Sequence, residues 1–160
     1  MKEIYEEYSK TIYKYLLTLT NNVEIAEELL QETFYSAVKN INKFRGDSNI
    51  KNWLYKIAKN KYIDYYKKNK KIKEIKIDEC NENVLLDDSF EDKFENKEKL
   101  LNICKKIHRL DEKTKEVVYL RIGTNFNFRE IGNIIGQSED YARTIFYRAK
   151  IKLKEELNDE

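Results

Sequence analysis

Apolar side chains in the first half of the chain recur every three or four residues, which is the spacing of one face of an α-helix. This pattern predicts helices over residues 3–20, 23–41 and 50–71. A pair of asparagines after the first helix and the polar stretch 45–49 interrupt the pattern, and Ser48 is a suitable N-cap for the third helix. Three amphipathic helices of this kind predict a small helical bundle.

The second half of the chain begins with a stretch of weak periodicity and returns to helical spacing from about Phe94. Asp111 is placed to cap a helix that carries Val117 and Val118, and Gly123 is placed to end it. With no proline and only four glycines in 160 residues, the chain lacks the turn residues that a sandwich or barrel needs. We therefore expect an all-α fold.

Residues 127–150 have the layout of a helix-turn-helix. Asn127 and Glu130 form a capping pair at the start of a short helix. Gly136 allows the positive φ that ends this helix, and Ser138 can cap the long helix that follows. One face of the long helix carries side chains that suit base edges and phosphates, namely Arg143, Thr144, Tyr147, Arg148 and Lys150. An ordinary helical hairpin with a solvated basic face would show the same pattern.

The charge of the chain is divided into blocks, although its formal net charge is only +2. Residues 1–38 carry a net charge of −4, residues 39–76 of +10 and residues 78–98 of −7. Residues 141–154 hold five basic side chains and no acidic one. Clustered positive charge gains free energy on binding a polyanion because counterions are released. Two basic zones therefore favour nucleic acid as a partner over a merely solvated lysine coat.

Aromatic and lysine side chains alternate along residues 53–66. On a helix, such a surface can stack unpaired bases on its rings and neutralise phosphates with its lysines. Each stacked base is worth roughly 1–3 kcal/mol, which is comparable to the cost of unstacking it from a duplex. Trp53 and Tyr55 also fit the core of a bundle, so the pattern alone leaves both roles open for them.

Together these patterns predict two small helical domains, an N-terminal bundle at residues 1–72 and a C-terminal helix-turn-helix domain at residues 96–160. Residues 73–95 are acidic and weakly periodic and are interpreted as a flexible linker. No apolar run reaches the roughly 18–20 residues of a membrane-spanning helix, and no signal peptide is recognisable. Because Cys80 and Cys104 have no paired spacing, we expect reduced thiols in a cytoplasmic protein.

Several segments follow one another in an order that is typical of one protein family. Residues 26–34 (AEELLQETF), 44–46 (FRG) and 53–60 (WLYKIAKN) resemble region 2 of bacterial RNA polymerase sigma factors of the extracytoplasmic-function class, in the sigma-70 family. Residues 110–153, with the pieces REIG and YRAK, resemble region 4. The resemblance implies a promoter-specificity subunit without catalysis or cofactor. The implied partners are core RNA polymerase (the coiled coil of its largest subunit and its flap), duplex and single-stranded promoter DNA, and an anti-sigma factor.

The resemblance also implies roles for individual residues. A base flipped from the non-template strand of the −10 element would be held by loop residues Arg45, Asp47, Ser48 and Asn49. The melting junction would be bordered by Trp53, Tyr55, Lys56, Lys59 and Asn60. The −35 element would be read as duplex by the basic face of the last helix, with Arg143, Thr144, Tyr147, Arg148 and Lys150. Polymerase would bind the second helix at Glu28, Leu30, Gln31, Glu32 and Phe34.

Gly132 departs from the family pattern, which usually has alanine at this place. We expect it to lower the stability of the first helix of the helix-turn-helix by up to about 1 kcal/mol. Many arginines of the family are lysines here, which preserves the charge but removes bidentate recognition.

Two other classes of function fit parts of the pattern. A stand-alone helix-turn-helix regulator would bind duplex DNA as a dimer, with residues 1–70 used for dimerisation or sensing. A metal-dependent nuclease would use carboxylates from among Glu27, Glu28, Glu32 and Asp64. Glu28 and Glu32 share a helix face, but such a pair is common on surface helices. Cys104 and His108 have the i, i+4 spacing of metal ligands, but two ligands do not make a zinc site. Cys104 fits the core better.

Overall fold

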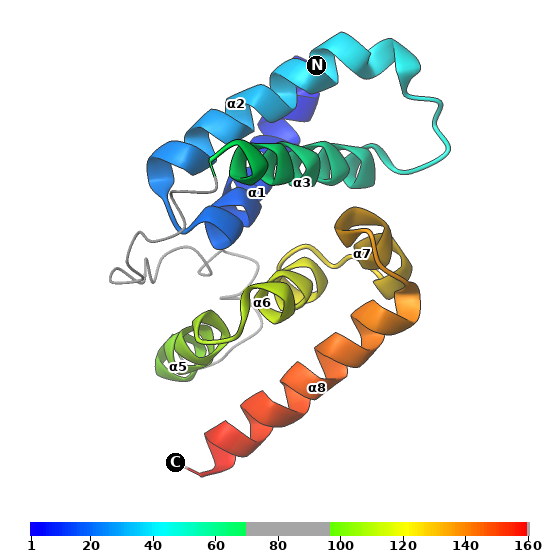
Figure 1. The fold of residues 1–160 in the computed structure, drawn as a ribbon. Helices are drawn as coiled ribbons and strands as arrows, with labels where there is room; N and C mark the ends of the chain where they lie inside the picture. Colours follow the sequence, from blue (N-terminus) through cyan, green and yellow to red (C-terminus); the bar gives the residue numbers. More distant parts are fainter. Residues whose placement is uncertain (70–96, 160) are drawn as a thin grey trace. The chain divides into compact units, whose positions relative to one another are not determined.

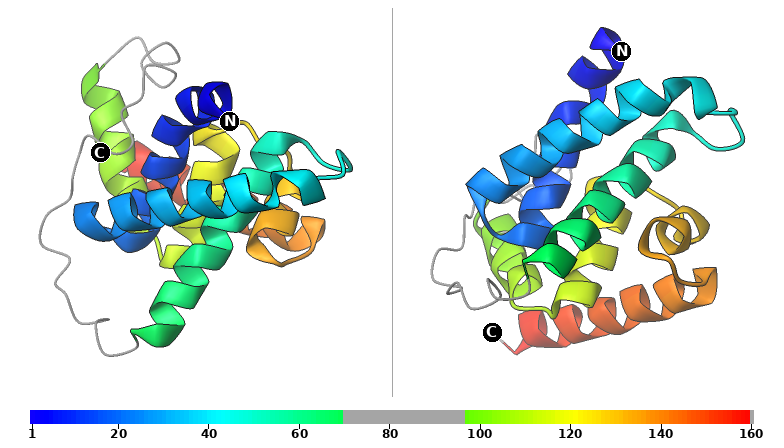
Figure 2. Two further views of the ribbon diagram at one scale, coloured as in Figure 1. Left: turned by 90° about the horizontal axis from the view of Figure 1, so that it is seen from above. Right: turned by 45° about the horizontal axis from the view of Figure 1, so that its top comes forward.

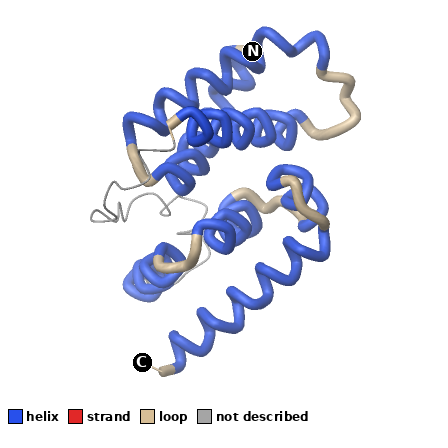
Figure 3. Tube along the Cα trace, in the orientation of Figure 1, coloured by secondary structure: helices blue, strands red, loops and turns tan. Residues whose placement is uncertain are grey.

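The computed structural model describes residues 1–69 and 97–159, and these residues form helices and connecting loops without strands (Figure 1, Figure 3). The chain divides into two compact units, Met1–Ile77 and Asp78–Glu160. The prediction of an all-α chain with two small helical domains is confirmed. The predicted linker, residues 73–95, lies outside the described residues, and so does Cys80.

The first unit is a bundle of three long helices that pack pairwise against one another (Figure 2). They are α1 at Lys2–Thr20, α2 at Val23–Asn40 and α3 at Ile50–Lys68, and a short 3-10 helix, η1 at Ile41–Lys43, continues α2. The predicted ranges agree with these bounds to within one residue, except that α3 ends at Lys68. Residues 70 and 71 of the predicted third helix lie outside the described residues. An apolar face on each helix, buried against the other two, holds the bundle together.

Asparagines form the junctions of this bundle. Asn21 adopts the left-handed conformation at the end of α1 with φ 50°, and the side chain of Asn22 accepts a backbone N–H from the first turn of α2. Asn49, not the predicted Ser48, caps α3, and its Oδ1 accepts the backbone N–H of Lys51 at 3.0 Å. Both residues suit an N-cap, so the cap depends on where the loop from η1 joins the helix.

The core of the first unit contains two large aromatic side chains as well as aliphatic ones. Tyr15 and Tyr55 are fully buried, and their ring centroids lie 5.1 Å apart. The aliphatic side chains packed with them at 0 or 1% exposure are Ile12, Leu16, Leu29 and Leu54. Burial of one such side chain contributes about 1.5–3 kcal/mol, so these residues stabilise the bundle substantially.

The second unit consists of α5 at Lys97–His108, α6 at Glu112–Val118, η4 at Tyr119–Gly123, α7 at Phe128–Ile135 and α8 at Glu139–Asn158. The long helix α8 packs against α5, α6 and α7. A wider π-helical turn, η4, continues α6 to the predicted end of the helix. The fully or nearly fully buried side chains of this unit include Ile107, Val117, Leu120, Phe126, Ile131, Ala142 and Ala149.

Local side chains form the caps that the sequence predicted for this unit. The side chain of Asp111 accepts the backbone N–H of Thr114 at 3.0 Å. Asn127 and Glu130 form the predicted reciprocal capping box, with distances of 2.8 and 2.9 Å. Gly136 ends α7 with φ 72°, and the hydroxyl of Ser138 caps α8. These contacts define a helix-turn-helix, and Cys104 lies in the core beside it, 4% exposed.

Gly132 has a packing role that the sequence did not reveal. A Cβ atom at this position would lie 2.7 Å from the backbone oxygen of Gln137 and 3.0 Å from backbone atoms of Ser138. The carbonyl of Gly132 also accepts the backbone N–H of Gln137 at 2.8 Å. The absence of a side chain therefore lets the turn pass close to α7. The expected cost in helix propensity considered the helix alone, and the contact with the turn was not visible in the sequence.

We predict that Gly132→Ala destabilises the protein by about 1–2 kcal/mol, because the overpacking cost exceeds the gain in helix propensity. Urea unfolding followed by circular dichroism measures this change. Arg129→Ala, at an exposed position of the same helix, is the matched control and should change stability by less than about 0.5 kcal/mol. Unchanged or increased stability of Gly132→Ala would show that the turn accommodates a methyl group.

Candidate nucleic-acid and polymerase interfaces

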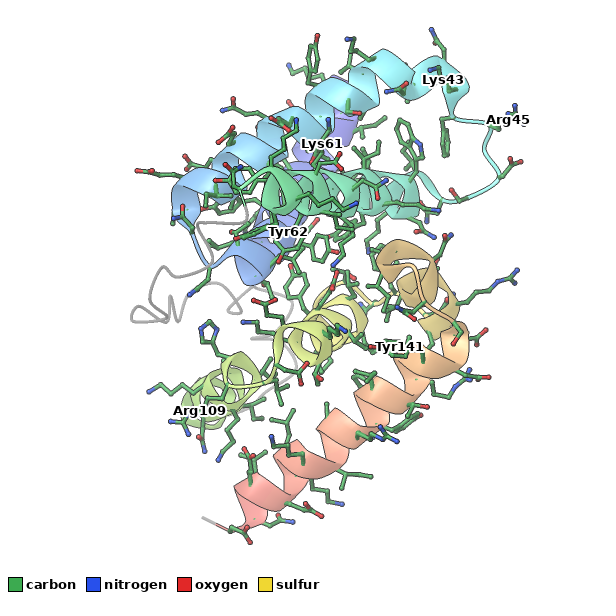
Figure 4. All side chains as sticks on the ribbon, viewed as in Figure 1. Lys43, Arg45, Lys61, Tyr62, Arg109 and Tyr141 are labelled. Carbon is green, nitrogen blue, oxygen red and sulfur yellow. The ribbon has the colours of Figure 1, made fainter. Side chains whose placement is uncertain are left out.

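The loop between η1 and α3 presents polar side chains to solvent. Arg45, Asp47 and Asn49 are exposed and Ser48 is half-buried, and Figure 4 shows Arg45 on this loop, next to Lys43 at the end of η1. The loop turns at a glycine with φ 76°. The side-chain oxygen of Asn49 is already used by the cap of α3, so its amide nitrogen is the group that faces away from that hydrogen bond.

Trp53 lies in the first turn of α3, directly after this loop, and is half-buried. Its ring centroid is 5.2 Å from that of Phe44, and the two rings are tilted by 45°. Part of the indole is therefore packed and part is open to solvent, which supports neither of the two simple expectations for Trp53. Sequence reasoning did not assign a role to Phe44, although its place directly before the polar loop was visible.

Tyr55 does not belong to this surface. It is 0% exposed and packs on Tyr15, so its ring cannot receive a base while the bundle is folded. The prediction that Tyr55 borders the melting junction is therefore wrong. The reason is helical geometry, because Tyr55 lies on the same side of α3 as Leu54 and Ala58, and all three side chains are 0% exposed.

The solvent side of α3 carries the remaining predicted contacts. Lys56 and Asn60 are exposed, and Lys59 is half-buried with its Nζ 5.2 Å from the ring centroid of Tyr62. Tyr62, labelled with Lys61 in Figure 4, is the first ring of a cluster. Its centroid lies 4.6 Å from that of Tyr66, which lies 5.4 Å from that of Tyr65. This tyrosine cluster extends the basic and aromatic surface along α3 beyond the residues to which the resemblance gave roles.

The solvent face of α2 is acidic and polar. Glu28, Gln31 and Glu32 are exposed and Leu30 is half-buried. Phe34 is only 6% exposed, and its ring packs edge-on against Tyr5 at 4.8 Å between centroids. Phe34 is therefore a core residue, and the prediction that it contacts polymerase directly is wrong.

Helix α2 also presents an exposed apolar pair and borders a hollow of mixed polarity. Tyr35 and Val38 are 66% and 53% exposed, and the Nζ of Lys39 lies 5.0 Å from the ring centroid of Tyr35. A shallow hollow of about 380 Å³ lies between α1 and α2, lined by Tyr5, Ser9, Lys10, Tyr13, Glu27, Leu30 and Gln31. Tyr35 and Val38 are three residues apart, so the sequence already placed them on one side of the helix, away from the buried face.

Helix α8 separates an inner and an outer face as predicted. Ala142 and Ala149 are 0% and 2% exposed, and Ile145 is half-buried. On the outer face, the exposed side chains are Thr144, Tyr147, Arg148 and Lys150. Within the described residues, Arg148 and Lys150 form no ion pair, so both charges face solvent.

Arg143 differs from the other basic side chains of α8. Its Nη2 lies 2.7 Å from Oε1 of Glu139, and its Nη1 lies 2.8 Å from Oδ1 of Asp140. Its guanidinium carbon also lies 5.5 Å from the ring centroid of Phe128 in α7. Arg121 approaches the same ring at 4.5 Å and donates from Nη1 to the carbonyl oxygen of Phe126 at 2.9 Å. Phe128, which the sequence indicated only as an apolar residue, thus organises the start of the helix-turn-helix.

The described residues contain no group of three or more His, Cys, Asp or Glu side chains that could hold a metal ion. Across residues 1–69 and 97–159, no helix combines the length and apolar character that crossing a membrane requires. Burial and the charge of Lys115 lower the pKa of His108, and burial raises the pKa of the Cys104 thiol.

Comparisons with known proteins match a family model to the first unit and two relatives to nearly the whole chain. Residues 4–72 match the family model Sigma-70 region 2. The chain is 29% identical to RNA polymerase sigma factor YlaC of Bacillus subtilis (strain 168), over 98% of this chain and 91% of that relative. It is 30% identical to ECF RNA polymerase sigma factor SigM of the same organism, over 95% of this chain and 91% of that relative.

Solved structures show the same fold. Sigma factor RpoE of Bartonella quintana, in complex with the anti-sigma factor NepR, matches with a TM-score of 0.70 at 20% identity, over 99% of this chain and 98% of that chain. CnrH, in complex with the cytosolic domain of CnrY, matches with a TM-score of 0.62 at 17% identity, over 99% of this chain and 88% of that chain. At these identities the comparison supports the fold of the chain.

The relationship to SigM decides between the classes of function. It covers nearly the whole of both chains and not one motif alone. Because sigma factors are specificity subunits and not enzymes, the nuclease alternative is wrong. The chain belongs to the extracytoplasmic-function class of RNA polymerase sigma factors, which direct promoter recognition by the polymerase.

Proposed function

We propose that the chain binds core RNA polymerase, recognises the −10 and −35 elements of a promoter and helps to open the DNA. In this proposal residues 1–72 act as region 2, residues 96–160 act as region 4 and residues 73–95 connect them. The observation that carries the proposal is the pair of separate surfaces on one chain of this family. One is a helix-turn-helix with an exposed basic face on α8, and the other is a basic, aromatic face on α3.

The first unit is proposed to hold the opened strand of the −10 element. The loop side chains Arg45, Asp47, Ser48 and Asn49 would surround a flipped base, and the half-exposed ring of Trp53 offers a stacking partner beside them. Lys56, Lys59 and Asn60 lie further along α3 and would contact phosphates or sugars at the melting junction. Tyr55 supports this surface only from inside the bundle.

The second unit is proposed to read the −35 element as duplex. Thr144, Tyr147 and Arg148 lie on the outer face of α8, where a recognition helix meets the major groove, and Lys150 extends this face toward the phosphates. Arginine can donate two hydrogen bonds to a guanine edge, so Arg148 is the side chain best suited to direct base recognition. Arg143 differs from these side chains, because it already forms ion pairs within α8 in the chain without DNA.

The acidic face of α2 is proposed to bind the coiled coil of the largest polymerase subunit, and the second unit to bind the flap. Glu28, Leu30, Gln31 and Glu32 are the proposed contacts, since all four are at least partly exposed. This face repels phosphates, so it suits a protein partner better than DNA. An anti-sigma partner for this chain is supported by the RpoE structure, which contains the anti-sigma factor NepR. A place of action in the cytoplasm is supported by the CnrH structure, which contains the cytosolic domain of CnrY.

Gln31→Ala is predicted to weaken binding to core polymerase by about tenfold, because it removes an exposed amide from the centre of the proposed docking face. Competition against the wild-type chain for core enzyme measures this loss. Asn42→Ala removes an exposed amide beyond the end of α2 and serves as the matched control, with unchanged binding. Equal binding of wild-type and Gln31→Ala chains would contradict the proposed docking face.

Transcription by core polymerase with and without the chain, on sheared DNA of the source genome, tests the whole proposal. We expect discrete start sites that appear only with the chain present, each preceded by two shared sequence elements. A chain that starts no transcription but binds tightly by itself to a two-fold-symmetric duplex would instead be a stand-alone regulator. An electrophoretic shift with and without core enzyme distinguishes these outcomes.

A further inference from the structure

Arg143 lies one turn into α8 and forms ion pairs with both acidic residues of the first turn of this helix. The carboxylates of Glu139 and Asp140 each form an ion pair with one terminal nitrogen of Arg143, at 2.7 and 2.8 Å. These two residues follow the N-cap directly, and their carboxylates also suit the positive end of the helix. The arginine side chain is 43% exposed, so it is accessible to DNA while it is held.

The ring of Phe128 supports the same guanidinium from α7. Its centroid lies 5.5 Å from the guanidinium carbon, a distance at which a cation and an aromatic face attract each other. Contacts from two helices therefore limit the rotamers of Arg143. A preorganised guanidinium loses less conformational entropy on binding than one that samples many rotamers.

The charge of this group also differs from that of the rest of the outer face. Glu139, Asp140 and Arg143 together carry a net charge of −1, whereas Arg148 and Lys150 have no carboxylate partner among the described residues. Phosphates of any duplex attract Arg148 and Lys150. They attract Arg143 less, because Glu139 and Asp140 neutralise its charge. Two of the five N–H donors of Arg143 are taken, and the others stay available for a base edge.

We propose that Glu139 and Asp140 are specificity-determining residues, which hold Arg143 in position for a base of the −35 element and screen it from phosphates of other DNA. Both act through Arg143 and are positioning residues. The inference rests on the proposed function of the second unit. It predicts that removing the carboxylates strengthens binding to DNA in general and weakens the preference for the correct sequence.

The test uses the full chain with Glu139→Gln, Asp140→Asn and both together. The first probe is a random-sequence duplex of about 30 base pairs, titrated by fluorescence anisotropy at several salt concentrations. We expect the double variant to bind it about three- to tenfold more tightly, with a salt slope steeper by about 0.9 because one more phosphate is contacted. Glu155→Gln removes one carboxylate from the last turn of α8, as each single variant does from the first turn, and should leave both values unchanged.

The second measurement compares holoenzymes on a promoter from the transcription experiment and on the same promoter with a scrambled −35 element. The ratio of transcripts from the intact promoter to those from the scrambled promoter should fall about fivefold in the double variant. The reason is that the carboxylates no longer hold Arg143 in position for a base. An unchanged ratio, with wild-type transcription intact, overturns the inference and leaves the proposed function standing. If the wild-type holoenzyme starts no transcription, the proposed function fails, and that result depends on no variant.

The same substitutions in an Arg143→Ala background show whether the carboxylates act through the arginine. The inference requires that Glu139→Gln and Asp140→Asn then have no further effect on binding to the random duplex. An equal gain with and without Arg143 overturns it, because the carboxylates would then act by repelling phosphates themselves. Circular dichroism of each variant checks that α8 has kept its helicity.

Discussion

Replacing Tyr55 with alanine is expected to unfold the first unit or to lower its stability by about 3–5 kcal/mol. The side chain is 0% exposed and packs on Tyr15 between three helices, so its removal leaves a large cavity. The whole stability of a small domain is on the order of 5–15 kcal/mol, so such a loss is severe. Thermal unfolding followed by circular dichroism measures the effect.

Tyr55→Phe and Trp53→Ala are the variants that separate a core role from a role in DNA binding. Tyr55→Phe keeps the ring and should cost less than about 1.5 kcal/mol, with transcription preserved. Trp53→Ala removes a half-exposed ring, so it should reduce promoter opening more than it reduces stability. A stable Tyr55→Ala chain that fails only in opening DNA would contradict the assignment of Tyr55 to the core.

Arg148→Ala is expected to reduce discrimination of the −35 element by about ten- to a hundredfold. A bidentate contact between arginine and guanine is worth about 1–3 kcal/mol of discrimination, and Arg148 is exposed on the outer face of α8 without an ion-pair partner among the described residues. The measurement is the ratio of transcripts from a promoter with an intact −35 element and one with a substituted element.

Lys152→Ala is the control for the loss of positive charge on the same helix. It removes one exposed basic side chain four residues after Arg148, so it should weaken transcription from both promoters to a similar extent. The base-reading role of Arg148 would be contradicted if Arg148→Ala also lowered both equally, because the arginine would then act only on phosphates.

The sequence pattern could not distinguish Arg143 from Arg148. Both are arginines on the outer side of one helix, and both received the same role from the resemblance. The structure separates them, since Arg143 is held by two carboxylates and an aromatic ring whereas Arg148 is open to solvent. The partners at i−3 and i−4 were visible in the sequence, but the ring of Phe128 comes from another helix.

The sequence by itself determined the elements whose contacts are local along the chain. The capping box of Asn127 and Glu130, the left-handed turn at Gly136 and the cap at Ser138 all join residues within four positions of one another. Such contacts depend on residue type and spacing, so they could be predicted without knowledge of the packing. The family resemblance, which rests on ordered motifs, was likewise contained in the sequence.

Only the tertiary structure decided which aromatic side chains support the fold and which face solvent. Phe34 and Tyr55 were predicted as contacts, yet they are buried, whereas Tyr35 and Val38 are exposed. It also decided that Gly132 makes room for a neighbouring turn. The physical reason is that burial depends on how the helices pack against one another, and helical periodicity defines a face without identifying what covers each residue of it.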